Sequence, residues 1–268
     1  AIFRSVKDNF ISPLIAAFKI EAINQDSTAL VIKVNDIYNG TETSINNVFT
    51  NINLGTSAIK NLSRILSIKS FPNNVVATSE LTTKVTEGTT SVYVTVEVSS
   101  SILLLPEKPM TGRFDNQKVG YFTNPLLSFS DAQQGTDKKQ YITRWRMEPK
   151  PEDREAYLKG QTVEPIKPIV FYIDNSTPYQ WRSYIKKGIE DWQTAFEKAG
   201  FKNAIIAKEI TDSMHVDMDD VNYSVLTYAA SEKKNAMGPS LLDPRSGEIL
   251  EADIMWWHNV LSMVREWI

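Results

Sequence analysis

The hydrophobic period of this chain changes near Pro165. From Phe18 to Val98 apolar residues mostly alternate with polar ones, as in Val92-Tyr-Val-Thr-Val-Glu-Val98. A period of two is typical of half-buried strands, and Asn39-Gly40 and Glu87-Gly88 supply turn residues between them. We therefore predict an antiparallel β-rich domain in the first half of the chain.

A proline-rich connector follows that domain. Its prolines fix φ repeatedly and disfavour long regular elements between Leu105 and Lys167. The charged stretch from Glu152 to Gly160 predicts a short solvated helix. We place the domain boundary near Pro165, which gives residues 1–165 as the β-rich domain with its connector and residues 166–268 as a second domain. The prolines concerned are Pro106, Pro109, Pro125, Pro149, Pro151, Pro165 and Pro168.

The second domain reads as strand, helix and strand. Ile166 to Ile173 is a β-branched and aromatic run, and Thr177-Pro178 is typical of a helix start. Gly200 is placed to stop the helix, and Ala204 to Ile210 forms the next apolar run, which predicts a parallel crossover. One helix face carries the apolar stripe Trp181, Tyr184, Ile185, Ile189, Trp192, Phe196 and Ala199.

Two further strands are predicted toward the end of the chain. They cover Tyr223 to Ala230 and Ile249 to Trp256, and the second is entered through a turn at Asp243-Pro-Arg-Ser-Gly247. Together with the first half, these elements indicate an α+β fold class, with an antiparallel β-rich domain followed by the start of an α/β domain.

Charge and composition exclude several classes of function. The net charge is −3, with pI about 5.6, so the basic footprint of a nucleic-acid-binding domain is missing. Cysteine is absent, which removes disulfides and thiolate metal sites. The apolar runs are far shorter than the ~20 residues of a membrane span. No glycine-rich phosphate loop or nucleophile elbow occurs.

The histidines and aspartates that could bind a metal ion are not spaced like the ligands of a metal-binding motif. The two histidines, His215 and His258, are 43 positions apart and no His-Glu-x-x-His occurs, so each is interpreted as a surface or hydrogen-bonded side chain. The segment from Asp243 to Glu248 is read as a hairpin turn and not as a cation site. A solvated acidic loop is the interpretation of Asp212, Asp217, Asp219 and Asp220.

Exposed tryptophans can form a sugar- or peptide-binding surface, and the candidates for such a surface are Trp181, Trp192, Trp256 and Trp257. The first two lie on the apolar face of the predicted helix. Because that face is expected to pack on a sheet, we interpret Trp181 and Trp192 as core residues.

Several segments, in order, resemble a family of large bacterial zinc metalloproteases, common in Bacteroidetes, that join an uncharacterised N-terminal domain to a metzincin-like catalytic domain. The matching segments are Ser70–Val75, Leu103–Met110, Arg113–Phe122, Tyr141–Arg146, Lys167–Asp174, Trp192–Ala204 and Gly238–Ile249. The resemblance implies an extracellular or cell-envelope protein, in the periplasm or on the outer membrane, and a zinc-dependent peptidase as the parent.

In that family the zinc-binding motif lies beyond the segment that matches Gly238 to Trp256, so no catalytic or metal residue and no cofactor is assigned to this chain. Zinc is expected in the full-length parent. The resemblance also implies that one antiparallel strand borders the cleft and pairs with extended substrate. Our candidate for that strand consists of Glu251, Ala252, Asp253, Ile254 and Met255.

Two alternatives remain beside the peptidase hypothesis. The β-rich half could be a non-catalytic module that binds a cell-surface glycan or protein, or that covers the cleft. The chain could also be an independent protein with a decayed protease fold. Both termini are expected to be cut ends, and the apolar stripe Val260, Leu261, Val264 and Trp267 predicts an interrupted helix. We therefore expect the remainder of the catalytic domain and a peptide substrate as partners, together with self-association of the fragment.

Overall fold

The structure is a computed structural model that describes residues 2–10, 14, 16–40, 47–52, 54, 57–116, 118–132, 134–211 and 213–267. The chain divides into two compact units, Ala1–Leu104 and Leu105–Ile268. Each unit is described by itself. Both contain helices and strands, and antiparallel pairing dominates the first, in agreement with the predicted α+β class.

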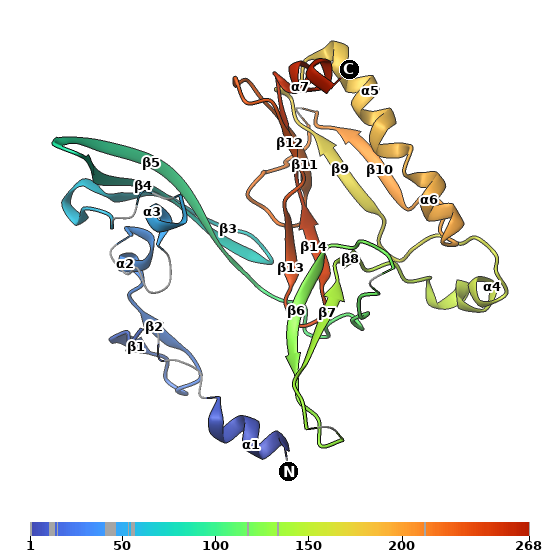
Figure 1. Ribbon diagram of the computed structural model, residues 1–268, viewed down its shortest axis with the longest axis horizontal. Helices are drawn as coiled ribbons and strands as arrows, with labels where there is room; N and C mark the ends of the chain where they lie inside the picture. The colour runs from blue at the N-terminus through green and yellow to red at the C-terminus, as the bar shows by residue number, and fades with distance from the viewer. Residues whose placement is uncertain are drawn as a thin grey trace. The chain divides into compact units, whose positions relative to one another are not determined.

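A three-stranded antiparallel sheet forms the centre of the first unit (Figure 1). Its order is β3 (Arg64–Ser70), β4 (Asn74–Glu87) and β5 (Thr90–Leu103). Strands β4 and β5 pair along all fourteen residues without a register shift, and Gly88, at φ 58°, lies in the turn that joins them. Valines occupy every second position from Val92 to Val98 of β5, and this pattern favours one register, because a slip of one residue would turn these valines to the other face.

Smaller elements complete the first unit. The short hairpin of β1 (Ile20–Ile23) and β2 (Leu30–Ile32) is exposed on all residues. Tyr38 and Phe49 are buried, as is Leu81 of β4. Gly40 lies close to Leu81 and has φ +74°, so a side chain there would be strained. The helices are α1 (Ile2–Asn9), α2 (Asn35–Tyr38), α3 (Val48–Asn51) and the 3-10 turn η1 (Lys60–Leu62).

A five-stranded mixed sheet dominates the second unit, in the order β10, β9, β11, β15, β12 (Figure 1). Strands β9 (Ile169–Ile173), β10 (Ile205–Glu209), β11 (Ser224–Ala229) and β15 (Ile254–Trp257) run parallel to one another. Only β12 (Ala236–Met237), at the edge, runs antiparallel to β15. The strand, helix and strand predicted from 166 to 210 are therefore confirmed, with β9 and β10 parallel as expected.

The helical segment between β9 and β10 packs against this sheet. It consists of α5 (Tyr179–Glu190) and α6 (Gln193–Lys198), separated by a turn, so the single helix predicted up to Gly200 is in fact two. Ile185 and Ile189 of α5 are buried with Ile173, and Phe196 packs against the same cluster. Gly200 has φ +91°, which confirms it as the left-handed residue after the helix. The helix start was misplaced by one residue, because Pro178 is the N-cap and Thr177 is held by Asp174.

Two smaller sheets and the last helix complete this unit. One is the hairpin of β6 (Thr123–Ser128) and β7 (Asp137–Ile142). The other has the order β13 (Ser240–Asp243), β14 (Glu248–Ala252), β8 (Arg144–Trp145). Residues 243–248 form the turn of the β13–β14 hairpin, as predicted. The remaining elements are η2 (Pro151–Asp153), α4 (Arg154–Leu158) and α7 (Val260–Trp267), and α4 agrees with the predicted solvated helix.

The division between the compact units follows Leu104, whereas the sequence placed the domain boundary near Pro165. The connector lies within the second unit because it packs on that unit. Val163 donates to the Gly200 carbonyl at 3.0 Å and is buried with Phe201. Strand β8 pairs with β14, more than a hundred residues later. Such contacts are not visible in a local proline pattern.

Candidate functional site

The five predicted substrate-binding residues do not form one strand. Glu251 and Ala252 end β14, Ile254 and Met255 begin β15, and Asp253 lies between the two sheets. The break has a clear cause, because the Asp253 carboxylate accepts the Val225 N–H at 2.8 Å and its own N–H donates to the Pro239 carbonyl. The single strand predicted from Ile249 to Trp256 is therefore two strands, in two sheets.

The backbone of these five residues is already paired along the chain segment 236–243. Glu251 lies opposite Leu241 and Ala252 opposite Ser240, in the β13–β14 ladder. Met255 lies opposite Met237 of β12 on one side and Thr227 of β11 on the other. Both β12 and β13 are end strands in their sheets. The outer border of this region is therefore the segment 236–243, and the predicted residues lie one strand behind it.

Glu251 is the most unusual titratable group of this region. Its side chain is buried, with 8% of the residue exposed, and Oε1 has no hydrogen-bond partner among the described residues. Burial raises the pKa of Glu251 to about 8, and the neighbouring Asp253 carboxyl adds to the shift. The Glu251 side chain, at the junction of the two sheets, is therefore a neutral carboxyl group near neutral pH.

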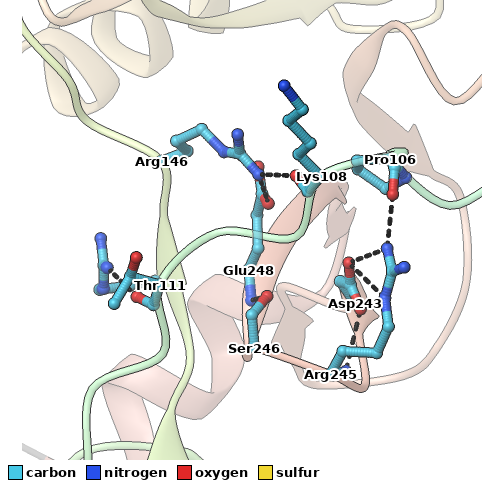
Figure 2. A network of polar contacts seen from close by, with 9 residues as sticks. Pro106, Lys108, Thr111, Arg146, Asp243, Arg245, Ser246 and Glu248 are labelled. Carbon is cyan, nitrogen blue, oxygen red and sulfur yellow. Dashed lines mark hydrogen bonds and ion pairs between the residues drawn. The ribbon is translucent and has the colours of Figure 1, made fainter.

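A charged network surrounds the turn end of the β13–β14 hairpin (Figure 2). Arg146, which follows β8, donates to both carboxylate oxygens of Glu248, from Nε at 2.8 Å and from Nη2 at 2.6 Å. The same Nη2 donates to the Lys108 carbonyl at 3.0 Å. A bidentate ion pair of this kind fixes the relative orientation of its two side chains more strongly than a single hydrogen bond does. Arg146 thereby links β14 to Lys108, near the start of the second unit.

The turn itself contains the second half of this network (Figure 2). Asp243 is fully buried and accepts from Arg245 Nε at 3.0 Å and from Nη2 at 2.8 Å. Arg245 Nη2 also donates to the Pro106 carbonyl at 2.6 Å. The Arg245 guanidinium holds the pKa of the Asp243 carboxyl below its usual range. Because this carboxylate is satisfied by Arg245, the turn interpretation is correct and the cation interpretation has no support.

Polar groups also gather where the parallel strands end. His258 follows β15, and its Nδ1 lies 2.6 Å from the hydroxyl of Tyr228 on β11. The hydroxyl oxygen of Ser176, after β9, lies 2.8 Å from the Asp174 carboxylate and 3.0 Å from the Tyr228 carbonyl oxygen, and either group can accept its single proton. The carboxyl ends of parallel strands are a common place for ligands. Sequence reasoning missed this cluster except for His258, although positions that directly follow predicted strands would have indicated it.

No metal centre is formed by the part of the chain that the structure describes, since no three His, Asp or Glu side chains gather there to hold an ion. His258 is hydrogen-bonded and His215 is exposed, in agreement with their interpretation. Within the acidic loop, Asp219 N–H donates to the Asp217 carboxylate and Asn222 N–H donates to Asp220. Asp212 lies outside the described residues. No described helix has the length and apolar character needed to cross a membrane.

The tryptophans of the helical segment are not core residues, which corrects the prediction for Trp181 and Trp192. Trp192 is 64% exposed, because the chain turns between α5 and α6 at this residue, and Trp181 is 37% exposed. Tyr184, at 71%, also faces solvent. Trp192 borders a shallow open hollow of about 380 Å³ whose other lining residues are Gly188, Asp191, Thr194, Ala195 and Lys198.

Comparison with known proteins gives one match. No curated protein and no solved structure matches the chain. The model of a family described as "Domain of unknown function (DUF5117)" matches residues 1–150, which include the whole first unit and the second as far as the segment after β8. This match spans more than half of the 268 residues, and the chain therefore belongs to the DUF5117 family.

Proposed function

We propose that this chain is the non-catalytic front part of a zinc-dependent endopeptidase of the cell envelope or the extracellular space. In this proposal the second unit contributes one border of the substrate cleft, and the first unit is an accessory domain. The supporting observation is the mixed sheet, in which four parallel strands are followed by one antiparallel edge strand, β12. This order agrees with the metzincin-like architecture that the sequence resemblance implies.

The proposed substrate border is the segment 236–243. It is antiparallel to the chain behind it, and β12 and β13 are end strands. An extended peptide can add to such an edge through backbone hydrogen bonds, while neighbouring side chains select its residues. Met237 and Leu241 are 48% and 40% exposed and offer apolar contacts to a peptide. Residues Glu251 to Met255, which the sequence predicts as substrate-binding, would support this edge from behind.

Zinc has no set of ligands among the described residues, and no step that depends on the metal is assigned to them. The proposal places the metal, and the residues that activate water, in a further part of the parent protein. The reading frame of the source gene is expected to continue beyond Ile268 into a His-Glu-x-x-His motif. A stop codon there would overturn the peptidase proposal.

A binding experiment tests the proposed border directly. Fluorescent, chemically unfolded casein serves as the extended probe, and its affinity for the chain is measured by anisotropy. Leu241→Asp is expected to weaken binding about tenfold, which corresponds to about 1.4 kcal/mol. The matched control is Leu158→Asp, on α4, where the leucine is 75% exposed and lies far along the chain from the border. Equal binding by the two variants would contradict the proposal.

A second function is favoured by a separate observation, the exposed aromatic residues of α5 and α6. Trp192 beside its hollow, with the polar groups of Asp191, Thr194 and Lys198, has the composition of a site for a glycan or a protein segment. On this alternative the chain is a non-catalytic cell-surface binding module. Glycan-array binding that is lost in Trp192→Ala but kept in Leu241→Asp would favour it over the peptidase border.

A further inference from the structure

Strand β5 is a long edge strand with an uninterrupted register. It pairs with β4 over fourteen residues, from Thr90 opposite Glu87 to Leu103 opposite Asn74. The sheet order is β3, β4, β5, so β5 is the last strand on its side, and no described strand pairs with its outer edge. An edge of this length exposes a row of backbone donors and acceptors that can template another strand.

The register identifies the residues whose backbone groups point outward. Leu104 N–H donates to the Asn73 carbonyl, which makes this pair a hydrogen-bonded one. In an antiparallel ladder the residues of one strand turn their N–H and C=O groups alternately toward and away from the neighbour. Even-numbered residues of β5 therefore bond to β4, while the outward set is Ser91, Tyr93, Thr95, Glu97, Ser99, Ser101 and Leu103.

The two edges of this sheet are protected very differently. On the opposite edge, β3 carries Arg64 and Lys69 and has a register irregularity between Ile65 and Ser67. Basic side chains and bulges are devices that prevent edge-to-edge pairing. In contrast, β5 contains no Lys, Arg or Pro, has no register shift and carries a single charge, Glu97. The β5 edge is therefore the one that remains competent to pair.

The side-chain pattern of β5 indicates which strand would fit beside it. Even positions place four valines on one face, namely Val92, Val94, Val96 and Val98, while the odd positions are mostly hydroxyl-bearing residues. A matching strand must alternate in the same way and carry few charges. A second copy of β5 meets this requirement, because antiparallel pairing through the outward residues places even positions opposite even positions.

We propose that β5 pairs antiparallel with β5 of a second copy of this chain and joins the two sheets into one. With the two-fold axis at Val96, residues 90–102 overlap, Val94 lies opposite Val98, and Glu97 lies opposite Thr95. An axis at Glu97 is disfavoured, because two carboxylates would then lie directly opposite each other. The pairing breaks no hydrogen bond between β5 and β4, because it uses only the backbone groups of β5 that point away from β4.

Two substitutions at one position test the proposal. Glu97→Pro removes an outward N–H without removing a bond to β4, and proline is tolerated on an edge strand. Sedimentation velocity from micromolar to millimolar concentration is expected to show a dimer for the wild-type chain and at least about tenfold weaker association for Glu97→Pro. Glu97→Thr keeps the N–H and removes the charge, so association is expected to be equal or stronger. Circular dichroism establishes that both variants fold.

Hydrogen exchange on the wild-type chain provides a test that does not depend on a variant. Even-numbered amides of β5 should be protected at every concentration, because they bond to β4. Odd-numbered amides should become protected only as the dimer forms. The proposal is overturned if the chain stays monomeric or if odd-numbered amides exchange freely in a dimer. It is also overturned by a dimer that survives Glu97→Pro and is lost in Leu261→Asp of α7.

Discussion

The β4–β5 hairpin of the first unit and the β13–β14 hairpin of the second are both antiparallel, yet different interactions hold them. Hydroxyl pairs join β4 to β5, as between Thr82 and Thr95 at 2.9 Å and between Thr86 and Ser91 at 2.9 Å. At the β13–β14 turn the buried carboxylates of Asp243 and Glu248 are instead paired with the partly exposed guanidinium groups of Arg245 and Arg146. The comparison leads us to expect that the loss of one hydroxyl pair is tolerated in the first hairpin, whereas the loss of one buried carboxylate at the second is more costly.

The largest expected effect concerns pH and is confined to the second hairpin. The folded-state pKa of Glu251, about 8, lies above the ordinary value of 4.5. Its contribution to stability is therefore complete below about pH 4.5 and is lost as pH rises toward about 8, at up to about 1.4 kcal/mol per pH unit. Urea unfolding at several pH values measures this slope.

Glu251→Gln is the control for that prediction, because an amide cannot ionise. Its unfolding free energy should lack the decrease between pH 4.5 and about 8 that the wild-type chain shows. Asp243 should act in the opposite direction, since its lowered pKa means that its contribution is lost as pH falls through that value. Identical pH profiles for Glu251→Gln and the wild-type chain would contradict the assignment.

The next effect compares the removal of one polar contact in each hairpin. Asp243→Ala deletes a fully buried carboxylate that accepts bonds from Arg245, and it is expected to destabilise the second unit by about 3 kcal/mol. Thr82→Val deletes one hydroxyl pair and is expected to cost about 1 kcal/mol, because the exposed Thr95 can bond to water instead. Denaturant midpoints measure both, and equal losses would remove the distinction between the hairpins.

The smallest contrast concerns the two turn glycines. Gly247, at φ +74°, has the Ile142 carbonyl oxygen 2.6 Å from where a Cβ would lie, whereas Gly88, at φ +58°, has open space around it. Gly88→Ala should therefore cost only the left-handed backbone penalty of about 1 kcal/mol, and Gly247→Ala about 2 kcal/mol. Thermal unfolding of the two variants measures the difference. Similar decreases in unfolding temperature for both would contradict the prediction.

Local patterns predicted the elements that depend on neighbouring residues. The period-two alternation determined the strands of the first unit, and the strand, helix and strand from 166 to 210 followed from apolar spacing with a glycine stop. The Asp243 to Gly247 turn was also predicted. In each case the physical cause lies within a few positions, in backbone dihedrals or in which face of an element is apolar.

The sequence by itself determined the long strands of the first unit, the strand, helix and strand with their parallel crossover, and the absence of a local metal motif. It predicted neither the short helices α1 to α3 nor the β6–β7 hairpin within the proline-rich connector. Tertiary structure decided the rest: that the connector belongs to the second unit, that Asp253 divides one apolar run between two sheets, that Trp192 faces solvent, and that segment 236–243 covers the predicted binding residues. Each depends on pairing between segments far apart in the chain. Local propensity does not predict which distant segments pair, because the free energy of that pairing comes from burial and hydrogen bonding between those segments.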